Sequence, residues 1–169
     1  MRCKEKEAVM KSFGIITLAF IVAGCATNQG TPGNDRVPSS ASCKLPTEQE
    51  IAALFDRWNQ SLLTGDPQKV LANYAQRSIL LPTLSNKPRV TPAEKEEYFR
   101  YFLQNRPSGK IDQRKIYVDC NSAVDAGLYT FTFGRTGAVV GARYTYTYAR
   151  DGSQWLITSH HSSAMPEKN

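Results

Sequence analysis

The chain is poor in the residues that bind metal ions and nucleotide cofactors. It has two histidines among 169 residues, His160 and His161, and they are adjacent. Neighbouring residues of a strand point to opposite faces, so this pair is badly spaced for a shared metal ion. None of the four cysteines stands in a C-x-x-C pair, and there is no G-x-G-x-x-G motif. We therefore expect no metal site and no cofactor.

Long apolar runs are also missing. Beyond the first 25 residues no stretch of 18 apolar residues occurs, which excludes a membrane-spanning helix in the mature protein. The hydrophobic fraction of 41% and the mean hydropathy of −0.42 indicate one folded domain rather than a disordered chain. Residues 1–24 account for +2 of the net charge of +6, so the chain from Cys25 carries +4, a mildly basic balance that leaves an anionic membrane surface or a small anion open as partner.

The first 24 residues have the order of an export signal. A basic start, Met10-Lys11, precedes an apolar run that ends at Cys25. The sequence Val22-Ala23-Gly24-Cys25 resembles the bacterial lipobox, and this implies that residues 1–24 are removed and that Cys25 carries lipid. Ala26 then implies an anchor in the bacterial outer membrane, facing the periplasm. The alternatives are an ordinary secretory signal with an incidental Cys25, and translation from Met10.

Residues 25–44 predict a lipidated flexible tether, because Gly, Pro, Ser, Asn and Thr dominate them. An exported and anchored protein does not meet the genome, so nucleic acid is excluded as a partner. Cys43 and Cys120 remain, and in an oxidising compartment this pair predicts a disulfide. Two buried free thiols are the alternative.

A domain is expected over residues 45–167, and it begins with helices. Thr47 and Glu50 have the spacing of a capping box. An apolar stripe at helical spacing follows, and Gly65 ends it. The stripe consists of Ile51, Leu54, Phe55, Trp58 and Leu62.

Two more helices are expected to begin at Asp66-Pro67 and Thr91-Pro92, where a capping residue precedes a proline. The first is short and carries Val70, Leu71 and Tyr74 inward. Runs rich in β-branched and aromatic residues predict strands over 78–81, 115–120, 128–133, 139–149 and 155–163. The order predicts an α+β fold, in which three helices cover one face of a curved, mostly antiparallel sheet.

The end of the chain carries a more specific signal. Residues 151–166 read D-G-S-Q-W-L-I-T-S-H-H-S-S-A-M-P. The skeleton D-G-x-W-L followed by His, Ser and Pro resembles the nuclear transport factor 2-like, or SnoaL-like, superfamily. The closest resemblance is to the association domain of calcium/calmodulin-dependent protein kinase II and to SgcJ/EcaC-like bacterial proteins. It implies a cone-shaped fold with a pocket, and self-association as a homodimer or a higher oligomer. No kinase catalytic motif is present.

The last strand supplies the candidate catalytic residue. If Trp155 packs toward the helices, strict alternation turns His161 and Ser163 into the pocket. His161 is then either a general acid or base and ligand anchor, or a hydrogen-bonded core residue. Tyr129 and Trp58 are expected to complete the ligand site.

Arg143 lies in the middle of a predicted strand among tyrosines and threonines. It either binds a ligand carboxylate in the pocket or stands on the outer, threonine-rich face. The carboxylates are less promising. Asp56 lies off the apolar stripe, and Asp112, Asp119 and Asp125 are placed in loops, turns or strand ends. No carboxylate is therefore expected on the pocket face, which argues against isomerase chemistry on a carbon acid.

Three functions remain open. The first is a lipoprotein whose self-associating domain binds a small anionic or aromatic molecule. The second is a cofactor-independent SnoaL-like isomerase or dehydratase that uses His161. The third is an oligomeric scaffold without catalysis. The residues favour a binding protein over an enzyme and name no substrate.

Overall fold

The computed structural model describes residues 43–167. The predicted signal peptide, Cys25 and most of the predicted tether lie outside these residues. No helix within 43–167 is long and apolar enough to cross a membrane.

Helix α1 (Glu48–Leu63) begins at the predicted capping box. The Glu50 amide donates to Thr47 Oγ1 over 3.1 Å, and the Thr47 amide donates to Glu50 Oε2 over 2.7 Å. The predicted apolar stripe is buried along the whole helix. Gly65 follows the helix with φ +68°, a left-handed conformation that glycine adopts without a steric penalty.

Two shorter helices follow, α2 (Pro67–Leu71) and α3 (Pro92–Phe102), and a 3₁₀ turn η1 (Leu103–Asn105) extends α3. Both begin at the predicted cap-and-proline pairs. Tyr74 was expected in the second helix, but it begins a strand. The main chain leaves the helix because the Asn73 carbonyl accepts a hydrogen bond of 2.8 Å from the Ile157 amide of the last strand.

The sheet has five strands in the order β1-β5-β4-β3-β2, and only β1 and β5 are parallel. The strands are β1 (Tyr74–Leu81), β2 (Pro107–Val118), β3 (Ser122–Phe133), β4 (Ala138–Asp151) and β5 (Gln154–Ala164). This arrangement confirms the predicted α+β fold. Strand β2 begins eight residues before the predicted strand. Its first half is polar and gives no strand pattern in the sequence, but it pairs with β3, with Lys110 opposite Thr130.

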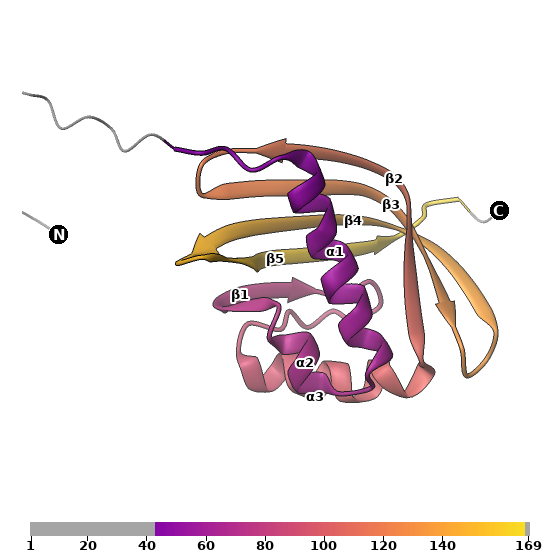
Figure 1. The fold of residues 1–169 in the computed structure, drawn as a ribbon. Helices are drawn as coiled ribbons and strands as arrows, with labels where there is room; N and C mark the ends of the chain where they lie inside the picture. The colour runs from indigo at the N-terminus through magenta and orange to yellow at the C-terminus, as the bar shows by residue number, and fades with distance from the viewer. Residues whose placement is uncertain (1–42, 168–169) are drawn as a thin grey trace, which may run out of the picture. The chain divides into compact units, whose positions relative to one another are not determined.

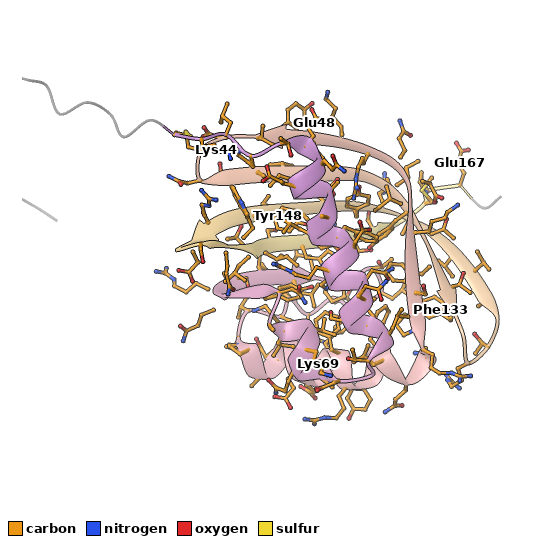
Figure 2. The ribbon with its side chains drawn as sticks, in the orientation of Figure 1. Lys44, Glu48, Lys69, Phe133, Tyr148 and Glu167 are labelled. Atoms are coloured by element: carbon orange, nitrogen blue, oxygen red, sulfur yellow. A yellow bond between two sulfur atoms is a disulfide. The ribbon has the colours of Figure 1, made fainter. Side chains whose placement is uncertain are left out.

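The helices lie on one face of the bent sheet, with α1 crossing it and α2 and α3 near one end (Figure 1). Side chains fill the space between α1 and the strands, among them Tyr148 from β4 (Figure 2). A bulge in β2 between Ile111 and Gln113 brings the main chain very close to Gly127 of β3. A Cβ atom at Gly127 would lie 1.9 Å from the Gln113 carbonyl oxygen, so only glycine fits at this position.

The predicted disulfide between Cys43 and Cys120 is present, with Cα atoms 5.5 Å apart. It joins the first described residue to the turn between β2 and β3 across 77 positions of sequence. Closing a loop of this length contributes about 4 kcal/mol in the chain-entropy model.

Candidate functional site

A cavity of about 300 Å³ lies between the helices and the inner face of the sheet. Its walls are mostly aromatic and aliphatic, and they come from α1, α3, β1, β3 and β4. The apolar lining includes Trp58, Leu80, Tyr98, Phe99, Phe102, Tyr129, Phe131, Phe133, Val140 and Ala142. Trp58 and Tyr129, both predicted as ligand-binding residues, therefore lie on this cavity. An apolar cavity with a few polar groups is the usual form of a small-molecule site.

A row of hydroxyl groups forms the polar part of the wall. The Tyr129 hydroxyl donates to Ser162 Oγ over 2.5 Å, and Ser162 Oγ shares a further hydrogen bond with Thr83 Oγ1. Ser162 comes from β5, and Thr83 comes from the loop after β1. Burial raises the pKa of Tyr129, so its hydroxyl keeps its proton and acts as a donor.

His160 lies beside this row and is 4% exposed. Its ring stacks on Tyr146, with ring centres 4.1 Å apart, and its Nδ1 lies 2.8 Å from the Tyr74 hydroxyl. Burial, reinforced by the neighbouring His161, lowers the pKa of His160 to about 3. The imidazole is therefore neutral near pH 7. Within residues 43–167 its Nε2 has no hydrogen-bond partner.

The structure places the two histidines in the reverse of the expected arrangement. A register shift between Thr147 and Tyr148 of β4 makes β5 bulge at Thr158. Beyond that residue the alternation of β5 is inverted, because a bulge adds one unpaired residue to a strand. His160 and Ser162 consequently line the cavity, and the expectation that His161 and Ser163 do so is wrong.

Arg143 and Ser163 do come together, but on the outer face of the sheet. Arg143 is exposed, and its Nε donates to Ser163 Oγ over 3.2 Å. Its Nη2 donates to the Ala164 carbonyl over 3.2 Å. Of the two orientations left open for Arg143, the structure has the outward one, so this guanidinium does not contact the cavity.

One inward carboxylate was missed by the sequence analysis. Asp125 of β3 is fully buried, and it accepts hydrogen bonds from Arg114 Nη2 at 2.9 Å and from the Tyr144 hydroxyl at 2.8 Å. Burial raises the pKa of Asp125, while Tyr144 and Arg114 lower it. Its spacing from Tyr129 already places it on the inner face, but the predicted strand began only at Leu128 and Asp125 was expected in a turn.

Asp125 does not line the cavity, since Tyr144 and Arg114 enclose it nearer the other end of β3. Asp56 is exposed, as expected from its place off the apolar stripe. Among residues 43–167 no three His, Cys, Asp or Glu side chains stand close enough together to hold a metal ion. The side chains at the cavity that can exchange protons are therefore hydroxyl groups and one neutral imidazole.

Helices packed on one face of a bent five-stranded sheet, with a cavity between the two layers, define a nuclear transport factor 2-like domain. The family model of the calcium/calmodulin-dependent protein kinase II association domain matches residues 47–166. The chain belongs to this family.

Two solved structures show the range of the similarity. One is a protein from Xanthomonas campestris that is described as a calcium/calmodulin-dependent protein kinase II association domain. It is 48% identical in sequence, and the match covers 73% of this chain and 91% of the other chain with a TM-score of 0.70. The iota-carbonic anhydrase from a cyanobacterium, solved in complex with bicarbonate, is 20% identical, with a TM-score of 0.65 over 73% of this chain and 94% of its own. A comparison with curated proteins gave no match.

Proposed function

We propose that the cavity binds bicarbonate and that the domain interconverts bicarbonate with carbon dioxide. The observation that carries this proposal is the hydroxyl row of Thr83, Ser162 and Tyr129 beside a neutral His160. The shared fold with a carbonic anhydrase that binds bicarbonate supports the same function.

The two parts of the cavity suit the two reactants. Carbon dioxide is apolar, and the aromatic walls accept it without displacing hydrogen bonds. Bicarbonate has three oxygens that need donors. When Tyr129 donates to Ser162 and Ser162 donates to Thr83, the Thr83 hydroxyl proton is free for one of these oxygens. Donors fixed in an apolar cavity stabilise a developing negative charge more strongly than water does.

In the hydration direction the oxygen of a water molecule forms a bond with the carbon of carbon dioxide. One proton of that water moves to His160 Nε2, in the tautomer whose Nδ1 proton is donated to the Tyr74 hydroxyl oxygen. The products are bicarbonate and an imidazolium, which then releases its proton to solvent. The new anion beside the ring raises the pKa of His160 while it is bound, and this stabilises the imidazolium.

Stopped-flow measurement of carbon dioxide hydration with a pH indicator tests the proposal. We expect activity in the wild type and a loss of kcat/KM of about 100-fold or more in His160→Asn and Ser162→Ala. The matched controls are His161→Asn and Ser163→Ala, which make the same changes one residue away on the outer face. Equal activity in each variant and its control, or no activity in the wild type, would overturn the proposal.

Self-association is proposed in addition, because the chain belongs to a family of association domains. The outer face of the sheet offers a surface for it, with small and threonine-rich positions around Arg143 and His161. Light scattering after size exclusion is expected to give a dimer or a higher oligomer. A charged substitution at this face, Thr145→Glu, should lower the mass. A monomeric wild type would contradict this proposal.

The lipid anchor at Cys25 and the location at the outer membrane, facing the periplasm, also remain proposals. The Cys43–Cys120 disulfide supports an exported, oxidising compartment. Incorporation of labelled palmitate into the wild type, and its absence from Cys25→Ser, is the expected result in a bacterial host. Label in both proteins or in neither would argue against the lipid anchor.

A further inference from the structure

We propose that a second cavity, between α2, β1 and α3, is a binding site for a small monovalent anion such as chloride, with Lys95 as its counter-charge. The cavity has a volume of about 160 Å³. It is lined by Leu71, Tyr74, Ala75, Gln76, Pro92 and Lys95. The proposal does not depend on the activity of the bicarbonate cavity.

Lys95 is unusual because it is 1% exposed, and lysine is almost never fully buried without a partner. Its Nζ donates one hydrogen bond within residues 43–167, to the Val90 carbonyl over 3.2 Å. An ammonium group has three N–H donors, so two of them are left for a ligand.

The carboxylates nearest to Lys95 along α3 are engaged with other groups. Glu94 accepts from the Val90 and Thr91 amides at the start of the helix and pairs with Lys87 over 3.1 Å. Glu96 pairs with Arg100 over 2.8 Å. Lys95 forms no ion pair among the described residues.

A buried cation without an ion-pair partner is costly, and here burial lowers the pKa of Lys95, an effect that the charge of Glu94 offsets only in part. An anion in the adjoining cavity would neutralise the ammonium and restore its pKa. The rest of the lining indicates which anion fits. It supplies one amide donor, Gln76, and apolar groups otherwise, so a singly charged and weakly hydrated anion suits it better than a divalent one.

The Lys95 cavity and the larger cavity are connected through one shared side chain. The Tyr74 side chain lines the Lys95 cavity, while its hydroxyl contacts His160 Nδ1. One side chain thus touches both sites.

Chloride titration of the full chain, followed by broadening of the ³⁵Cl resonance, tests the proposal. The test variant is Lys95→Met, which keeps the length and loses the charge, and near-UV circular dichroism checks its fold. The control is Lys69→Met, because Lys69 is an exposed lysine on α2 (Figure 2). We expect saturable broadening in the wild type and in Lys69→Met, and at least a tenfold weaker affinity in Lys95→Met. Equal affinities in all three proteins would overturn the proposal.

A second measurement needs no variant, in case Lys95→Met does not fold. The lysine Nζ resonances of the wild type are followed by NMR while gluconate, a bulky and strongly hydrated anion, is replaced by chloride at constant ionic strength. We expect the Lys95 resonance to shift and the pKa of Lys95 to rise, while the Lys69 resonance stays in place. A Lys95 resonance that does not respond to chloride would exclude the site.

Discussion

The Tyr74 hydroxyl and His160 Nδ1 lie 2.8 Å apart in the core, although the two residues are 86 positions apart in the sequence. Tyr74 begins β1, and His160 lies in the neighbouring β5. This contact fixes the orientation of the one buried imidazole of the domain, and it joins the first strand to the last.

Replacing Tyr74 with phenylalanine removes this hydrogen bond and leaves Nδ1 buried without a partner. We expect Tyr74→Phe to lower the free energy of unfolding by about 1–3 kcal/mol, as measured by urea denaturation. Tyr98→Phe is the control, because the Tyr98 hydroxyl makes no hydrogen bond within residues 43–167. A Tyr74→Phe protein as stable as this control would mean that the contact contributes little.

The buried histidine makes stability depend on pH. The pKa of His160 is about 3 in the folded domain, against an ordinary value of 6.5. Between these values the unfolded chain binds a proton that the folded chain does not bind. Stability is therefore lost as the pH falls from 6.5 toward 3, by up to about 1.4 kcal/mol per pH unit.

Urea denaturation between pH 4.5 and 7 checks this dependence. His160→Asn should flatten the slope, while His161→Asn should retain most of it, because burial is the larger cause of the lowered pKa of His160 and the charge of His161 the smaller. The same slope in both variants would show that the pH dependence has another origin.

Gly127 accommodates the bulge of β2, and a methyl group there would collide with the Gln113 carbonyl. We expect Gly127→Ala to lower the free energy of unfolding by about 3 kcal/mol or more. Gly141→Ala in the same sheet should leave the free energy of unfolding nearly unchanged. A Cβ atom at Gly141 would lie 3.8 Å from Met165 Cγ, which is an ordinary van der Waals contact. Equal midpoints of thermal unfolding for the two variants would contradict the packing argument.

The disulfide is expected to stabilise the domain mainly through the unfolded chain. The double variant Cys43→Ser, Cys120→Ser should be less stable by up to about 4 kcal/mol in urea, and reductant should lower the stability of the wild type alone. If reductant destabilises both proteins equally, its effect does not come from this bond.

Much of the fold follows from local sequence. The capping box at Thr47, the cap-and-proline pairs at Asp66 and Thr91, and the alternation of Tyr129, Phe131 and Phe133 each specify one element. Local chemistry determines such features, so they can be read from neighbouring residues. The pairing of Cys43 with Cys120 could be predicted because few cysteines remain in the exported chain.

The residues of the cavity could be predicted only in part. Which polar residues of β5 face the cavity depends on how β5 pairs with residues of β4 that are not adjacent to them in local sequence. No glycine or proline marks the bulge at Thr158, so the sequence gives no sign that the alternation of β5 inverts. Asp125 was missed for a different reason, because the predicted strand began only at Leu128 and β3 begins at Ser122. Tyr74 was misplaced because its strand forms through pairing with β5, which local propensity does not encode.

The bulge in β5 lies just before two doublets, His160-His161 and Ser162-Ser163. A shift of this strand by one residue would exchange its inner and outer faces. Because each residue type occurs twice in a row, such a shift would still present one histidine and one serine to the cavity. The doublets therefore make the composition of the site tolerant of the addition or loss of one residue upstream, a change that ordinarily destroys a site built on a strand.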